Sequence, residues 1–195
     1  MSKALQATSR PPQEAPLVNR LIELAKKQDR GALAALRSGL GKPPGAAPRM
    51  LPIVAPFLSS DEGPATRAAF ITAALFATHP EHAPIGSLGA SLWRATKRES
   101  NPNGKHGEAG VERRFAAALD APSEDLPRHL EGIVSLCESA GVPVDWHQFY
   151  RHVRGLLGTN EHYQISIRTR WARDFWGGPT EKLDPDETTE EEIEQ

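Results

Sequence analysis

The chain has 195 residues, of which 38% are hydrophobic, so it is long enough for one medium domain or two small ones with a real core. Its one cysteine excludes a disulfide framework or a thiolate metal cluster within the chain. The net charge of -2 hides an asymmetry, because residues 181–195 contain eight acidic residues and one lysine, whereas residues 1–180 carry 22 basic and 17 acidic residues. A mildly basic body with an acidic tail can accompany nucleic-acid binding, and the alternative is a solubilising tail on an ordinary domain.

The N-terminal stretch MSKALQATSRPPQEAP is polar and lacks the apolar core of a signal peptide. No apolar run in the sequence is long enough to cross a bilayer, and a single cysteine fits a reducing compartment. We therefore expect a soluble, cytoplasmic protein that does not associate with membranes.

Apolar residues recur at helical spacing and runs of β-branched residues are missing, so the sequence predicts an all-α fold. In the first half, Leu17, Leu21 and Leu24 line one face of a first helix. A second helix ends at Gly39 and Gly41, because glycine readily adopts the left-handed conformation that stops a helix. Three more helices are expected at about residues 49–58, 64–78 and 87–98.

The stretch ESNPNGKHG, residues 99–107, has two glycines, a proline and no large apolar residue, and it is the best internal boundary. After it the sequence predicts four further helices. The apolar stripe from Leu126 to Cys137 marks the cleanest of them, and Asp145 is expected to cap the next one. We therefore predict two small helical lobes, residues 15–98 and 107–177, followed by a disordered acidic tail, residues 178–195.

The stretch RTRWARDFW, residues 168–176, mixes arginines with aromatic residues and raises the question of base stacking. On a helix, however, Ile167, Trp171 and Phe175 are spaced by four and form a core stripe, which Tyr163 and Gln164 extend by one turn. Trp176 projects to the other side. The stretch is therefore expected to hold the last helix against the core.

Residue types for catalysis or metal binding do not form a recognisable set in the sequence. His79 and His82 have a short spacing but lie in a proline-rich turn without further ligands, so surface or capping roles are expected. No glycine-rich phosphate loop, metalloprotease motif or nucleophile elbow occurs. Cys137 lies on an apolar stripe and is expected to be buried. The sequence thus predicts a protein that is not an enzyme and uses neither a metal nor a cofactor.

Several basic residues point away from the apolar stripes when helix phase is followed at about 100° per residue. With Leu130 inward, Arg128 lies on the opposite face; with Phe115 inward, Arg113 points outward. Such residues could contact phosphates with an affinity that falls as salt rises, and the alternative is an ordinary solvated charged surface. The candidate nucleic-acid-binding residues are Arg37, Arg67, Lys97, Arg98, Arg113, Arg114, Arg128 and His129.

The order of five segments resembles the small-subunit (CasB) family of the type I-E CRISPR Cascade complex. The segments are RGALAALRSGLG, SLGASLWRA, VERRFAAAL, SEDLPRHLEGIVSLCESAGVPVDW and RTRWARDFW. The resemblance implies an all-helical, non-catalytic subunit, present as two copies in a crRNA-guided surveillance complex. It also implies contacts with the backbone and large subunits, binding to crRNA and target DNA without sequence preference, and stabilisation of the R-loop in antiviral defence.

The resemblance places the basic positions of the family at Arg37, Arg113, Arg114, Arg128 and His129. Where the family often has arginines, this chain has Asp120 and Ser123. Two other interpretations stay open. One is a purely protein-binding scaffold, whose arginines meet acidic patches on neighbouring subunits. The other, less favoured, is a free-standing helical DNA-binding regulator, for which no helix shows a clear recognition face.

Overall fold

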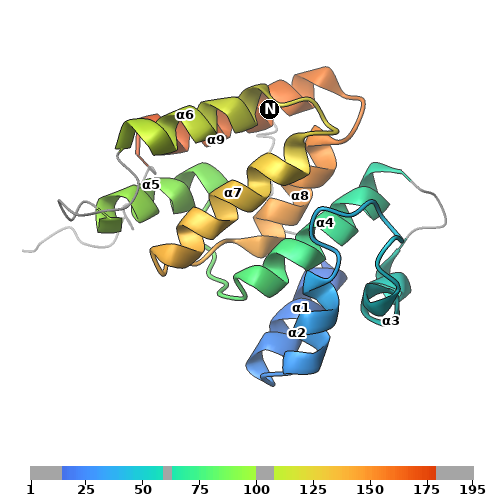
Figure 1. Cartoon of the computed structure of the whole chain (residues 1–195). Helices are drawn as coiled ribbons and strands as arrows, with labels where there is room; N and C mark the ends of the chain where they lie inside the picture. The colour runs from blue at the N-terminus through green and yellow to red at the C-terminus, as the bar shows by residue number, and fades with distance from the viewer. Residues whose placement is uncertain (1–14, 59–62, 100–107, 179–195) are drawn as a thin grey trace, which may run out of the picture.

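The structure is a computed structural model that describes residues 15–58, 63–99 and 108–178. Across these ranges it is helical without a strand, which confirms the predicted all-α class (Figure 1). The first half contains α1 (Pro16–Lys26), α2 (Arg30–Arg37), η1 (Pro48–Met50), α3 (Leu51–Val54), η2 (Ala55–Phe57), α4 (Pro64–Thr78) and α5 (Leu88–Glu99). The second half contains α6 (Glu108–Asp120), α7 (Leu126–Ser139), α8 (Trp146–Leu156) and α9 (Glu161–Trp176). The predicted boundary and acidic tail fall almost entirely outside the described residues.

Three helices begin at a side chain that accepts a hydrogen bond from the first turn. Asp145 Oδ1 accepts from the backbone N–H of Gln148 at 2.9 Å, which confirms the predicted cap of α8. Asp29 and Asn160 do the same for α2 and α9. Each cap satisfies a backbone donor that a helix start otherwise leaves without a partner.

The short helix predicted at about residues 49–58 is confirmed in extent, but the structure builds this segment from η1, α3 and η2 in succession and not from one regular α-helix. Pro52 and Pro56 lack a backbone N–H, so neither can donate the hydrogen bond that a continuous α-helix needs. Short helical turns with i to i+3 hydrogen bonds accommodate this spacing of prolines.

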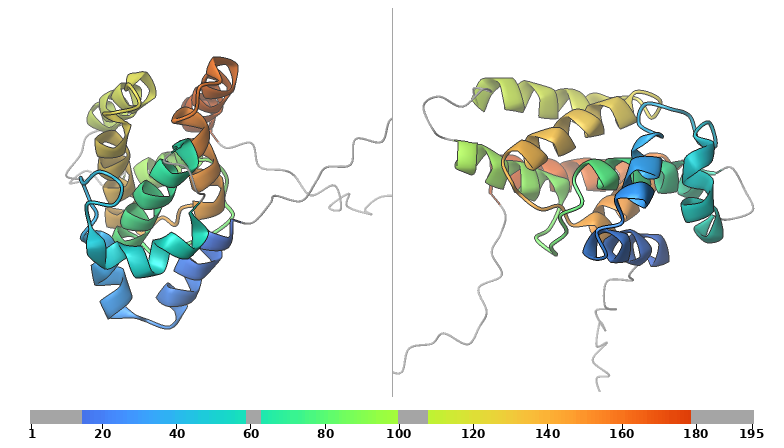
Figure 2. Two further views of the ribbon diagram at one scale, coloured as in Figure 1. Left: turned by 90° about the vertical axis from the view of Figure 1, so that its right-hand side faces the viewer. Right: turned by 60° about the horizontal axis from the view of Figure 1, so that its bottom comes forward.

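Helix α4 forms the centre of the fold and is buried on most of its circumference. It packs against α1, α2, α7 and α8, and Figure 2 (left) shows it in the middle of the molecule with α1 and α2 below it. The buried apolar residues of all the long helices form one continuous cluster.

The two predicted lobes are in extensive contact with each other. The helix pairs with the most extensive contact are α5 with α9 and α4 with α8, and both pairs join the first half of the chain to the second. A Cβ added at Gly89 on α5 would collide with the carbonyl oxygen of Trp171 on α9, so these two helices meet backbone to backbone. The division into lobes stays a prediction.

The core stripe predicted on the last helix is confirmed for Ile167, Trp171 and Phe175, which are all buried. Trp171 Nε1–H donates a hydrogen bond of 2.7 Å to Nδ1 of His152 on α8. Since an indole nitrogen can only donate, the neutral imidazole carries its proton on Nε2. The pair fixes α9 against α8 in the interior of the protein.

The predicted extension of this stripe to Tyr163 is wrong, because the Tyr163 side chain is 47% exposed. Its helical phase is that of the stripe, but its partner helix α8 ends at Leu156. Beyond Gly155, α8 therefore offers no side chains to cover the ring. Trp176 is 50% exposed, in agreement with its predicted position on the other side of α9.

Acid should destabilise the protein through His152. The pKa of His152 is lowered from 6.5 to about 4, mainly by burial and then by repulsion from Arg170 and Arg151. Between pH 6.5 and 4, His152 is therefore protonated in the unfolded chain but stays neutral in the folded chain. The stability contribution is complete above pH 6.5 and is lost as the pH falls toward 4, by a total on the order of 3 kcal/mol. Urea unfolding at several pH values measures this loss.

The control for this prediction is His152→Asn, which keeps an acceptor near the position of Nδ1 for the Trp171 indole but does not titrate. We expect a smaller dependence of the unfolding free energy on pH in this variant. Equal pH dependence in both proteins would show that His152 does not contribute.

Candidate nucleic-acid interface

Helices α6 and α7 pack side by side (Figure 1). They expose the basic residues that their helical phase directs outward. Phe115 on α6 and Leu130 on α7 are fully buried. Arg113 and Arg114 are exposed on α6, and Arg128 is exposed on α7. The inward and outward directions that helical phase predicted for these side chains are therefore confirmed on both helices.

Four of the eight predicted residues meet in one cleft between these helices. The cleft has a volume of about 560 Å³ and is lined by Arg113 and Arg114 from α6 and by Arg128 and His129 from α7. We call it the α6–α7 cleft. Its remaining lining residues are Gly110, Ala117 and Gly132.

The floor of the α6–α7 cleft is made of residues with little or no side chain. A Cβ added at Gly110 or Gly132 would have no heavy atom within 4 Å apart from its own helix and chain neighbours. The small floor leaves room for a ligand to approach the helix surfaces, and the longer basic side chains stand around it. Such a shape suits an extended polyanion better than a small compact molecule.

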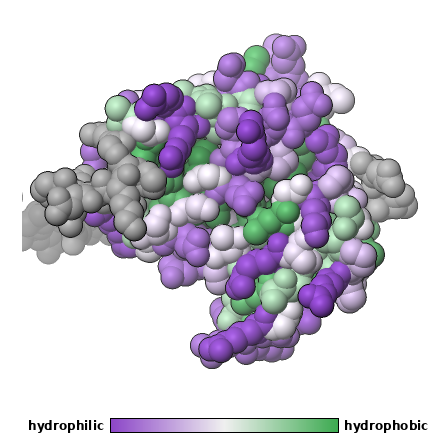
Figure 3. All heavy atoms as spheres, viewed as in Figure 1, coloured by the Kyte–Doolittle hydropathy of each residue, from purple (hydrophilic) through white to green (hydrophobic). Residues whose placement is uncertain are grey.

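The electrostatics of the α6–α7 cleft are one-sided, since no carboxylate lines it. Within the described ranges, the ion pairs Arg20–Glu23 and Arg173–Asp174 involve none of its residues. Figure 3 shows hydrophilic side chains gathered over α6 and α7 on this face. The three arginines are thus available to neutralise phosphates.

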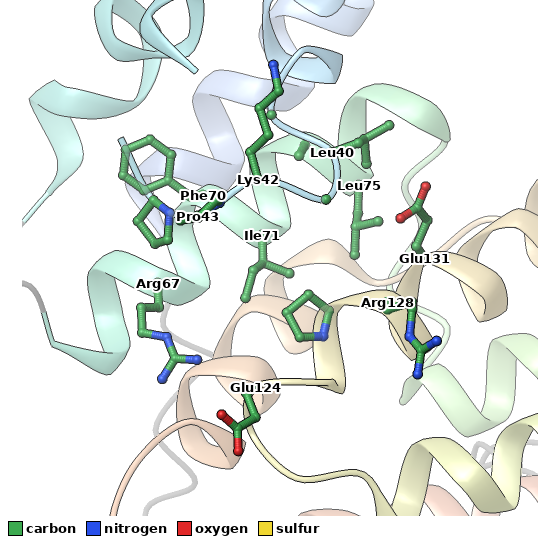
Figure 4. A pocket seen from close by; sticks show the side chains of 15 residues that line it. Leu40, Lys42, Pro43, Arg67, Phe70, Ile71, Leu75, Glu124, Arg128 and Glu131 are labelled. Carbon is green, nitrogen blue, oxygen red and sulfur yellow. The ribbon is translucent and has the colours of Figure 1, made fainter. Parts of the chain in front are cut away.

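A second, larger groove adjoins the cleft and shares Arg128 with it. This groove has a volume of about 710 Å³ and lies between α4, α7 and the loop after α2. Its apolar floor includes Phe70 and Ile71. Figure 4 shows charged side chains of both signs around it: Arg67, Arg128, Lys42, Glu124 and Glu131. Arg67, which donates a 3.4 Å hydrogen bond to the carbonyl oxygen of Ser123, therefore lies on the same side of the fold as the cleft.

The structure places the other predicted residues elsewhere. Arg37 Nε donates a 2.7 Å hydrogen bond to the carbonyl oxygen of Ala77, near the end of α4. Arg98 donates a hydrogen bond to the carbonyl oxygen of Gly141, and Lys97 Nζ lies 5.9 Å from the centre of the Trp93 ring. None of these three residues lines the α6–α7 cleft or the adjoining groove.

Sequence reasoning missed Lys42, which lines the groove with Arg67 and Arg128. Lys42 lies in the loop KPPGAAP, where no helical period exists to give a direction. Its position follows only from the packing of that loop against α4.

No group of three or more potential metal ligands occurs among the described residues. His79 is buried, and its Nε2 lies 2.7 Å from the carbonyl oxygen of Val142; His82 Nδ1 lies 3.2 Å from that of Val144. Both histidines thus join the turn after α4 to the segment before α8. None of the described helices is long and apolar enough to span a bilayer.

The fold and the cleft define an all-helical protein that presents a basic cleft, free of carboxylates, to solvent. A family model described as CRISPR-associated protein Cse2 matches residues 32–176, most of the chain. The chain belongs to this Cse2 family, whose members are also called CasB.

Individual relatives agree with this assignment. The CRISPR-associated protein Cse2 of Thermus thermophilus is 30% identical over 149 residues, which are 75% of this chain and 79% of that protein. A crystal structure of a Cse2-family protein from Thermus thermophilus has a TM-score of 0.67 at 29% identity, covering 86% of this chain and 98% of the other. A chain of a CRISPR RNA-guided surveillance complex, in a pre-nicking state, has a TM-score of 0.64 at 25% identity, with 82% and 91% covered.

Proposed function

We propose that the chain is a non-catalytic structural subunit of a type I-E CRISPR Cascade complex and binds nucleic acid without sequence preference. The observation that carries the proposal is the meeting of three arginines and a histidine in one cleft without carboxylates. Membership of the Cse2 family, and the likeness to a chain of a CRISPR RNA-guided surveillance complex, support the assignment to such a complex.

Binding without sequence preference follows from the chemistry of the cleft. Arginines on an open helix surface contact phosphate oxygens, which are the same for every base. Counterions leave the nucleic acid when these contacts form, so affinity should fall steeply with salt. Arg67 and Lys42 would add positive charges in the adjoining groove, where Glu124 and Glu131 also lie.

Within the complex, we infer that two copies of the chain work in the cytoplasm beside the backbone and large subunits, close to crRNA and target DNA. Pairing of crRNA with target DNA exchanges one duplex for another at nearly balanced free energy. A few phosphate contacts can therefore shift the balance toward the R-loop. The proposed contribution to antiviral defence is this stabilisation, with no chemical step by the chain itself.

The test of the proposed site is the variant Gly132→Leu, which places a large side chain in the α6–α7 cleft. Gly132 is exposed on α7 and a Cβ there meets nothing within 4 Å, so the change should fit without disturbing the fold. Leucine also favours helix over glycine by up to about 1 kcal/mol. We expect roughly tenfold weaker binding to a labelled oligothymidylate, corresponding to about 1.4 kcal/mol, in fluorescence anisotropy titrations.

The matched control is Gly132→Ala, which adds one methyl group and leaves most of the cleft open. It should bind the oligothymidylate with nearly the affinity of the wild type. If Gly132→Leu is folded and binds as tightly as the wild type at every salt concentration, the cleft is not the binding site.

A purely protein-binding scaffold is the second candidate function, and the groove beside the cleft favours it. Its floor of Phe70, Ile71 and Leu75 is apolar, as in surfaces that other proteins cover. Capture of the other Cascade subunits by a chain with no affinity for nucleic acid at any salt concentration would select this candidate.

A further inference from the structure

The exposed ring of Tyr163 is held in place at the start of α9, where it lies against the end of α8. A Cβ added at Gly155 on α8 would lie 2.5 Å from ring carbon Cε1 of Tyr163, so the ring rests directly on the backbone of α8. Its exposed fraction is 47%. A rigidly supported aromatic ring that is open to solvent is a surface on which a base can stack.

Basic residues surround this ring. Tyr163, Arg151 and Arg154 line a cavity of about 590 Å³ between the end of α8, the start of α9 and the start of α4. No acidic residue lines the cavity. Within the described parts of the chain, neither arginine forms an ion pair.

Arg170 continues this basic surface along α9. It follows Tyr163 by seven residues, close to two full turns, so the two side chains leave α9 on nearly the same face, about 10 Å apart along the axis. Arg170 is exposed and has no acidic partner in the described residues. Both Arg170 and Arg151 lower the pKa of buried His152, after the larger effect of its burial, so their positive potential reaches the same point from α9 and α8.

We propose that Tyr163, Arg151, Arg154 and Arg170 form a second binding surface, the α8–α9 surface, for a single strand of nucleic acid. One base stacks on the Tyr163 ring, and the arginines contact phosphates on either side of it. A stacking ring among unpaired cations is the arrangement by which proteins hold single strands without reading their sequence. A double helix does not offer an unstacked base, so the surface selects a single strand.

The α8–α9 surface shares no residue with the α6–α7 cleft. Figure 2 (left) shows α6 and α7 on one side of the molecule and α9 on the other. The inference rests on the proposed function for its class of ligand, but the two surfaces are separate in space. Variants of one should leave the other intact, so the two proposals can fail independently.

The test compares Tyr163→Leu with Tyr163→Phe, in the full chain and also in the Gly132→Leu background. Loss of the ring should weaken binding to oligothymidylate by several-fold to about a hundredfold, whereas phenylalanine keeps the stacking surface and the affinity. The double variant Arg154→Ala/Arg170→Ala removes two exposed charges and should lower the salt slope by about 0.7 for each phosphate that the variant no longer neutralises. Lys26→Ala/Lys27→Ala, an equal change of charge at the exposed end of α1, is its control.

A strand carrying 5-iodouracil should, in addition, cross-link to the peptide that contains Tyr163. If Tyr163→Leu and the double arginine variant both bind oligothymidylate as the wild type does in both backgrounds, the proposal is overturned. It is also overturned if these variants lose only their association with the other Cascade subunits, because the surface is then a protein contact. Normal binding by Gly132→Leu together with weak binding by Tyr163→Leu would support the α8–α9 surface and exclude the α6–α7 cleft as a binding site.

Discussion

Replacing Arg113, Arg114 and Arg128 together with alanine is expected to lower the affinity for single-stranded DNA by about tenfold to a hundredfold. Each exposed charge pair contributes roughly 0.5–1 kcal/mol, and three of them add to that range when they act separately. The slope of log affinity against log salt should decrease by about 0.7 for each phosphate that the variant no longer neutralises. Anisotropy titrations at several salt concentrations measure both quantities.

The control variant Lys26→Ala/Lys27→Ala/Arg49→Ala removes the same charge from exposed positions on α1 and η1 that do not line the cleft. It separates a local interaction from the general attraction of a basic protein for DNA. Equal losses in both triple variants would mean that net charge alone drives binding. Unchanged affinity in the cleft variant would count against these three residues, although the chain would still belong to its family.

The helices of this protein were largely predictable because their apolar residues repeat at helical spacing over several turns. The stripe from Leu126 to Cys137 predicted α7, and Asp145 marked the start of α8 correctly. The segment around Pro52 was correctly predicted as helical, but a short apolar run does not show whether the helix is one regular α-helix or a succession of short turns. The predicted burial of Tyr163 was wrong, because helical phase gives the direction of a side chain but not the length of the neighbouring helix that would cover it.

The cleft was predictable only in part. Phase directed Arg113 and Arg128 outward, yet it could not show that they face a common space, which depends on how α6 packs against α7. Arg37 and Arg98 looked equivalent to them in the sequence. In the structure they bond to carbonyl oxygens that lie 40 and 43 residues away, at Ala77 and Gly141. Hydrogen bonds between residues this far apart cannot be predicted from the local sequence pattern.

Trp171→Ala is expected to destabilise the fold before it affects nucleic-acid binding. The Trp171 side chain is fully buried, and its indole donates to His152. Truncation of a buried tryptophan costs about 3–5 kcal/mol, a large share of the roughly 5–15 kcal/mol that keeps a domain folded. Nδ1 of His152 would also be left without its donor in a buried site. Urea unfolding followed by circular dichroism measures the loss of stability.

Trp176→Ala provides the matched comparison, because it removes the same side chain from the same helix at a position that is 50% exposed. Trp176 packs beside the rings of Phe115 and Phe175, so its removal should cost only about 1 kcal/mol. The folded fraction of Trp171→Ala should still bind single-stranded DNA, since Trp171 reaches neither basic surface. A stable Trp171→Ala protein that loses only its affinity for DNA would contradict the structural role of this residue and return the stretch RTRWARDFW to the binding site.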